Sequence, residues 1–206
     1  MLMAAELERL KSIILHMASH IRDIVSKTSK LFKEIDMDSR RGIWEEIDST
    51  SAMLDRIRKE FVNEVLVFMA RRQPLGKELL ISHTLISIAY DVYRISRYCR
   101  EIARIDSVLA PQFSVANIRV VGDAFEEATR AVERALDDLV RLKPTNENIV
   151  VEIDGRVDKL YNTLLVDVSS RDSVDRMTAL GILVMRHIER IVDHANYIER
   201  YLKDLE

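Results

Sequence analysis

The stretch MTALGILVMRHIERIVDHANYIERYLKDL, residues 177–205, decides the fold. Every third or fourth position belongs to one mainly apolar series, and this spacing lies along one side of a helix. The members of the series are Met177, Leu180, Val184, His187, Ile191, His194, Ile198, Tyr201 and Leu205. A stripe that stays in step over so many turns favours near-parallel packing of long helices.

The same spacing continues through most of the chain and predicts an all-α protein of six long helices. Short polar or proline-containing breaks separate them, at 36–39, 73–76, 111, 144–145 and 169–173. The helices are expected at residues 3–34, 38–71, 75–106, 114–142, 145–168 and 172–204. The first break offers a helix N-cap, and Thr145 is a candidate cap for the fifth helix. Segment 107–113 is the expected linker between two three-helix bundles, at 1–107 and 114–206.

Composition excludes several other classes of protein. The 206 residues include only 5 Gly and 3 Pro, too few for the many turns of an all-β protein of this size. Lys and Arg total 31 against 34 Asp and Glu, a net charge of −3, which argues against nucleic acid as a partner. Cys99, the only cysteine, rules out an internal disulfide and is expected to fill apolar space. Without a secretion signal or an apolar run near ~18 residues, a cytoplasmic location is expected.

The two halves of the chain form a weak internal repeat. Aligning Arg94-Ile95 with Arg190-Ile191 places the third helix over the sixth, 96 residues later. Aligning Asp55 with Asp158 places the second helix over the fifth, 103 residues later. Internal duplication supports two pseudo-repeated bundles.

Three segments are similar to the phosphate-uptake regulator (PhoU) family. They are Ala-Arg-Arg-Gln-Pro at 70–74, the helix ending at Tyr93–Arg97, and Arg-His-Ile-Glu-Arg-Ile-Val-Asp-His-Ala at 186–195. The resemblance implies a cytoplasmic adaptor that negatively modulates a Pst-type phosphate ABC transporter and phosphate signalling. The partners it implies are the transporter ATPase subunit and a sensor histidine kinase. The membrane would be reached only through partners, and a homodimer is a further candidate.

The resemblance also implies a metal site, because several family members bind metals at Glu/Asp-x-x-x-Asp motifs. Both motifs are intact in the second half, as Asp154 with Asp158 and Glu189 with Asp193. Each pair lies one turn apart on one helical face, so two adjacent helices could bring four carboxylates together. Such anions repel one another unless a cation neutralises them. Iron, zinc or manganese is the candidate metal; the alternative is a solvated acidic surface paired with nearby arginines.

The first half departs from the family pattern. Ser51, Tyr93 and Arg97 stand where acids are expected, and only Asp55 remains. A fixed positive charge at Arg97 would oppose a metal ion. The sequence therefore predicts at most one carboxylate cluster, in the second half.

The histidines have ordinary structural interpretations. His16 and His20 are spaced as a metal clip but lack an acidic helper, so they are interpreted as surface polar residues. His187 and His194 fall on the sixth-helix stripe and are expected to be buried and hydrogen-bonded, with His194 approaching the carboxylate cluster as the alternative.

Two basic clusters are open to two interpretations. Lys27–Lys30 and Arg71–Arg72 could face phosphate or an acidic partner, or be solvated helix ends.

No glycine-rich phosphate loop or nucleophile elbow is visible, so the protein is not expected to be an enzyme. The leading hypothesis is a regulator of phosphate transport. One alternative is a phosphate-transporter accessory protein of the same fold. Another is a carboxylate-bridged metal-binding helical bundle, although a ferritin-like site would need acid-x-x-His motifs that the sequence lacks.

Overall fold

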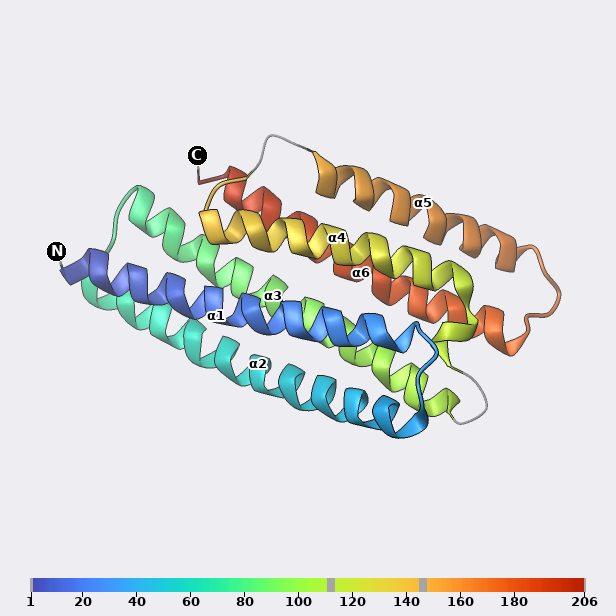
Figure 1. The fold of residues 1–206 in the computed structure, drawn as a ribbon. Coiled ribbons are helices and arrows are strands. Elements are labelled where there is room, and N and C mark those ends of the chain that lie inside the picture. The colour runs from blue at the N-terminus through green and yellow to red at the C-terminus, as the bar shows by residue number, and fades with distance from the viewer. Residues whose placement is uncertain (1, 111–113, 145–147, 206) are drawn as a thin grey trace.

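The computed structural model describes residues 2–110, 114–144 and 148–205, and within these ranges it contains helices and no strand. The elements are α1 (Leu2–Leu31), α2 (Met37–Arg72), α3 (Lys77–Leu109), a short 3-10 turn η1 (Val115–Asn117), α4 (Arg119–Arg141), α5 (Ile149–Ser169) and α6 (Arg176–Lys203). The all-α, six-helix prediction is confirmed (Figure 1).

The six helices pack as two groups of three lying side by side. Helices α1, α2 and α3 contact one another, as do α4, α5 and α6, while α3 lies along α6 and α1 along α4 (Figure 1). Buried apolar side chains from all six helices form one continuous core across this junction. Division into two domains at residues 107 and 114 stays a prediction.

Local capping explains where the helices begin and end. The Asp36 carboxylate accepts a hydrogen bond from the Ser39 amide at 2.9 Å and caps α2 as expected. Asp175 caps α6 in the same way through Thr178, at 3.0 Å, so α6 begins four residues later than predicted. The expected cap Thr145 and the linker residues 111–113 lie outside the described residues.

The turn after α2 follows the Gln-Pro signal. Gln73 adopts a left-handed conformation with φ of 48° and donates its backbone N–H to the Met69 carbonyl at 2.9 Å. Pro74 cannot continue a helix, so α2 ends here. This turn brings α3 back along α2 and puts the start of α3 at the same end of the molecule as the start of α1 (Figure 1).

A buried polar centre joins four elements at the other end of the first bundle. Asp106, in the last turn of α3, is fully buried and accepts from Arg40 at 2.6 Å, from Trp44 Nε1 at 2.9 Å and from the Val115 amide at 2.9 Å. Arg40, itself 3% exposed, also donates to two backbone carbonyls at and just after the end of α1. One carboxylate therefore links α1, α2, α3 and η1 where the chain leaves the first bundle.

Cys99 fills apolar space in the core, as predicted. It is completely buried, and desolvation raises the pKa of its thiol to about 12. A thiol that is neither accessible nor ionised at neutral pH is not a nucleophile.

Candidate functional site

Three of the four predicted acidic residues come together where α5 packs along α6. Asp158, Glu189 and Asp193 each offer a carboxylate oxygen, and these atoms all lie within 4.8 Å of one another. Within the part of the chain that the structure describes, they form the one group of three or more potential metal ligands at this spacing. We call these three residues the acidic cluster. Its origin is simple: Glu189 and Asp193 are one turn apart on α6, and α5 brings Asp158 to them.

Asp154, the fourth predicted residue, lies beside the acidic cluster but is held by another partner. The Asn196 amide, on the buried side of α6, donates to the Asp154 carboxylate at 2.7 Å. Asp154 is still close enough for the charges of Asp158 and Asp193 to raise its pKa. It is therefore a neighbour of the acidic cluster, outside the group of three.

Two arginines of α6 contact the acidic cluster directly. Arg186 donates to Glu189 at 2.6 Å, and Arg190 donates to Asp193 at 2.8 Å while lying 3.6 Å from Glu189. Three negative charges therefore face two positive charges, which leaves one net negative charge. These are the ion pairs of the alternative interpretation, and a metal would have to share the carboxylates with them or displace them.

Partial burial makes the charged form of the acidic-cluster carboxylates less favourable. Desolvation raises the pKa of Glu189, and the neighbouring Asp193 charge raises it further. Desolvation also raises the pKa of Asp193, which Arg190 partly offsets. For Asp154, desolvation raises the pKa and the hydrogen bond from Asn196 opposes it. Carboxylates with raised pKa values gain stabilisation from any added positive charge, and a divalent cation would supply it.

The corresponding place in the first half holds an arginine. The Asp55 carboxylate accepts from Arg58 at 2.8 Å and lies 2.6 Å from the Lys59 ammonium. The Arg58 guanidinium also lies over the Tyr93 ring, 5.0 Å from its centroid. Burial acts to raise the pKa of Asp55, but the bonds from Lys59 and Arg58 hold it below its usual range. A side-chain cation already neutralises this aspartate.

Arg97 does not play the part the sequence suggested. Its side chain is exposed, and the charge that meets Asp55 comes from Arg58 instead. Ser51, the residue aligned with Asp154, lies in the core with its hydroxyl 3.2 Å from that of Ser96. In the described residues of the first half, Asp55 is therefore paired with Arg58 and Lys59 at the place that corresponds to the acidic cluster.

The two α6 histidines lie at the α3–α6 interface, where both contact residues of α3. His194 is buried with its Nδ1 2.6 Å from the Asp91 carboxylate, so the predicted burial and hydrogen bond are confirmed. His187 is only partly buried, stacks on Tyr98 at 5.8 Å between ring centroids, and its Nδ1 has no hydrogen-bond partner among the described residues.

On α1, the Nε2 atoms of His16 and His20 lie 3.2 Å apart. Desolvation lowers the pKa of His20, and the neighbouring His16 lowers it further. No third potential ligand joins them within the described ranges.

Sequence reasoning missed Arg58 and Asn196, although both left a signal. Arg58 follows Asp55 by three residues, which is contact spacing on a helix. Asn196 lies four residues after Val192 and eight after Ile188, on a second buried row of α6. A buried amide requires a hydrogen-bond partner, and Asp154 supplies an acceptor for it.

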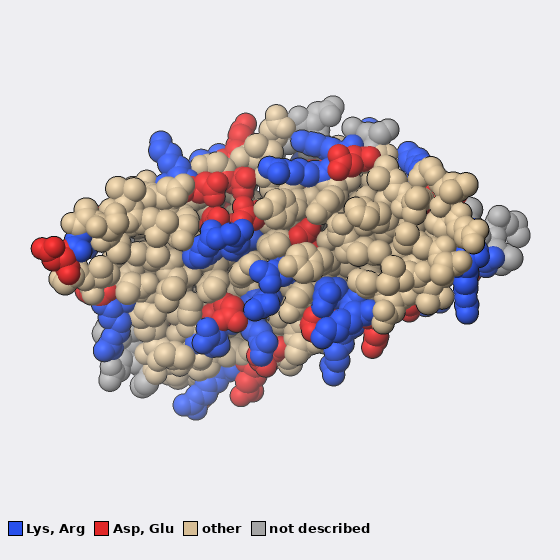
Figure 2. Space-filling view, turned by 180° about the vertical axis from the view of Figure 1, so that it is seen from behind, with Lys and Arg blue, Asp and Glu red and all other residues tan. Residues whose placement is uncertain are grey.

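The surface of the molecule carries charges of both signs. Figure 2 shows the face opposite to that of Figure 1, where Lys and Arg are intermixed with Asp and Glu. On this face no single broad basic patch gathers, in keeping with the net charge of −3. None of the described helices is long and apolar enough to span a membrane.

Comparison with known proteins finds similarity to one family over the first half of the chain. Residues 14–105, which span most of α1, α2 and α3, match the family model described as PhoU domain. The match therefore falls on the half that lacks the acidic cluster. Two relatives are each named phosphate-specific transport system accessory protein PhoU homolog. The one from Synechocystis is 22% identical and aligns over 93% of this chain and 85% of its own length. The one from Pseudomonas putida is 25% identical and aligns over 94% of this chain and 76% of its own length.

Solved structures share the whole fold. PhoU from Pseudomonas aeruginosa superposes with a TM-score of 0.79 at 22% identity, covering 98% of this chain and 97% of that one. The phosphate transport system regulatory protein PhoU from Streptococcus pneumoniae superposes with a TM-score of 0.77 at 15% identity, covering 98% of this chain and 96% of that one. The first half of the chain thus matches the PhoU domain model, and the whole chain shares the fold of these solved PhoU structures.

Proposed function

We propose that this protein is an accessory regulator of phosphate transport, which restrains a Pst-type ABC transporter by docking on its ATPase subunit in the cytoplasm. The observation that carries the proposal is its similarity to phosphate-specific transport accessory proteins over more than nine-tenths of its length. A sensor histidine kinase as a second partner and a homodimeric state belong to the same proposal.

A binding role fits the chemistry of the site better than a catalytic one. Two carboxylates of the acidic cluster, Glu189 and Asp193, are paired with Arg186 and Arg190, and the only thiol, Cys99, is buried and un-ionised. The side chains of Arg186 and Arg190 are 36% and 35% exposed, so a binding partner can reach them.

The direct test of the accessory role is removal of the gene from its host. Phosphate uptake measured in phosphate-rich medium is expected to rise in the deletion strain and to return to its original rate on complementation. In vitro, the purified protein is expected to bind the purified ATPase subunit of the phosphate transporter from the same genome. Unchanged uptake together with no binding would overturn the accessory role.

We further propose that the acidic cluster binds one divalent transition-metal ion, either iron, zinc or manganese. Asp158, Glu189 and Asp193 would be its ligands, and Asp154 would join them after release from Asn196. Carboxylate oxygens within 4.8 Å of one another and raised pKa values support this proposal, while the two arginines oppose it. The ion would supply the positive charge that the cluster lacks.

Metal analysis of protein purified without a tag or chelator tests this proposal. About one metal ion per chain is expected, on the ligand count of one carboxylate site, and the double variant Asp158→Asn/Glu189→Gln is expected to lose it. The matched control is Asp55→Asn, the aligned residue of the first half, which should leave metal content unchanged. Metal that is absent, or equal in all three proteins, would remove the metal site and leave the accessory role standing.

A further inference from the structure

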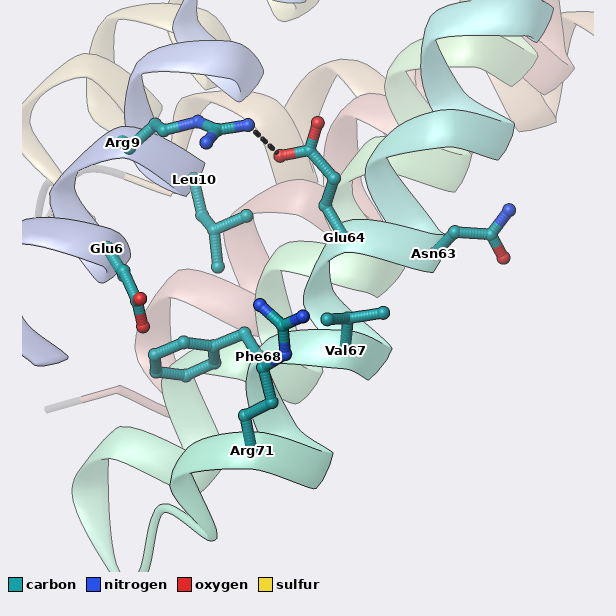
Figure 3. A pocket seen from close by; sticks show the side chains of 8 residues that line it. All are labelled: Glu6, Arg9, Leu10, Asn63, Glu64, Val67, Phe68 and Arg71. Carbon is teal, nitrogen blue, oxygen red and sulfur yellow. Dashed lines mark hydrogen bonds and ion pairs between the residues drawn. The ribbon is translucent and has the colours of Figure 1, made fainter.

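An apolar groove lies between the N-terminal end of α1 and the C-terminal end of α2. It has a volume of about 340 Å³. Leu10 and Phe68, both buried, and the half-exposed Val67 form its apolar surface, as Figure 3 shows. Its charged rim is formed by residues of both helices, among them Glu6, Arg9, Glu64 and Arg71.

Some of the charged side chains around the groove form ion pairs within the chain, and one does not. Glu64 accepts a bond from Arg9 at 2.6 Å, and Glu6 accepts two bonds from Arg72 at 2.8 Å each. Both acids are therefore paired within the chain. Arg71, in contrast, forms no hydrogen bond or ion pair with any of the described residues, and its side chain runs beside Phe68 and Val67 into the groove (Figure 3). The groove thus combines an apolar surface with one guanidinium that forms no direct bond and acts on the Glu6 carboxylate only through its charge.

The structure separates the two members of the Arg71–Arg72 cluster. Arg72 ties the end of α2 to the start of α1 through Glu6, which is an internal role. Arg71 has no such role and remains available to another molecule. A guanidinium with no internal partner beside apolar surface is typical of protein interfaces, where arginine is enriched.

Exposed apolar side chains extend around this end of the first bundle. Leu66 and Val67 on α2 are 51% and 48% exposed, and Leu75 in the α2–α3 turn is 80% exposed. Leu79 and Leu80 at the start of α3 are also exposed. Apolar surface gathered in one region, and rimmed by charge, marks a place where another molecule binds.

We propose that this groove is the docking site for an amphipathic helix of the ATPase subunit, which rests on the function proposed above. The helix would insert one large apolar side chain against Leu10, Val67 and Phe68 and place a carboxylate, one turn away, on Arg71. Two antiparallel helices with a hollow between them form the hole that receives such a side chain. A free inorganic phosphate fits less well, because it would find a single guanidinium and an apolar surface.

Affinity for the purified ATPase subunit, measured by biolayer interferometry with the full-length protein, tests the proposal. Val67→Glu and Arg71→Glu are each expected to weaken binding by about tenfold or more, as central interface residues do. Arg41→Glu is the matched control, because Arg41 is a 65%-exposed arginine at the opposite end of the same helix; it should change affinity by less than about twofold, as rim charges do. Circular dichroism verifies that all variants remain helical.

The outcomes separate this proposal from the function on which it rests. If the unaltered protein binds the ATPase and both groove variants bind equally well, the groove proposal is wrong and the accessory role survives. If the unaltered protein does not bind the ATPase, both fail. Loss of a homodimer in the groove variants would assign the groove to a second copy instead. Competition by inorganic phosphate would assign it to a small anion, and either result overturns the proposal.

Discussion

Replacing Asp106 with alanine is expected to lower the free energy of unfolding by about 3–5 kcal/mol, the range for breaking a buried ion pair from one side. The carboxylate is fully buried and accepts hydrogen bonds from Arg40, Trp44 and the Val115 amide. Its removal leaves the Arg40 guanidinium, only 3% exposed, without a counter-charge, and leaves the buried Val115 amide and the partly buried Trp44 indole N–H without this acceptor. Desolvated groups that lose their partners cost more than the bond itself contributes.

Urea unfolding at neutral pH, followed by circular dichroism, measures this change. Asp48→Ala provides the control, because Asp48 also pairs with an arginine, Arg100, but its side chain is 59% exposed. Such a surface pair is expected to contribute less than about 1 kcal/mol. Equal stability losses in the two variants would show that Asp106 does not organise the end of the first bundle.

Replacing Glu199 with glutamine is expected to stabilise the protein at pH 8, by about 3 kcal/mol on the scale of 1.36 kcal/mol per pKa unit. Glu199 lies between α6 and α4 and is 6% exposed. Desolvation raises its pKa from 4.5 to about 7, and both the charge of Asp138 and a hydrogen bond with it act in the same direction, against Lys203 and Arg134. At pH 8 the folded protein therefore holds a buried carboxylate that the glutamine amide would replace without charge.

The pH dependence gives the sign of the effect. Between about pH 4.5 and 7 the folded chain retains a proton that the unfolded chain has released, so stability falls as pH rises through this window. Glu199→Gln is expected to flatten that decline and to differ little from the original protein near pH 4.5.

Urea titrations at several pH values compare the two proteins, with Glu8→Gln as an exposed control expected to stay within about 0.5 kcal/mol. Parallel pH profiles for the original protein and Glu199→Gln would mean that Glu199 titrates normally.

The helices could be predicted because their apolar spacing is strong, but their partners could not. The α6 stripe correctly placed Val184, Ile191 and Ile198 in the core, where all three are fully buried. The contact of His194 with Asp91 joins residues 103 positions apart, and spacing within one helix carries no information about it. The start of α6 was predicted too early because several capping residues precede it, and packing selects Asp175 among them.

The acidic cluster was predictable in part for the same reason. Helical spacing alone places Glu189 and Asp193 on one face, and both join the cluster. Asp154 and Asp158 satisfy the same rule, yet only Asp158 joins it, because Asn196 across the α5–α6 interface binds Asp154. The rotation of α5 about its axis relative to α6 determines which aspartate joins the cluster. The spacing of residues within one helix does not specify that rotation.

The first half has an arginine where the second half has carboxylates, so the two halves of the molecule present different charges. If the two repeats were identical, a partner that binds one of them could bind the other equally well, because both would present the same surface. Here one repeat presents Asp158, Glu189 and Asp193, whereas the other presents Arg58 beside a single aspartate. A partner surface whose charges complement one repeat would therefore meet charges of the same sign if it bound the other repeat. Two halves of one architecture therefore have a distinguishable head and tail.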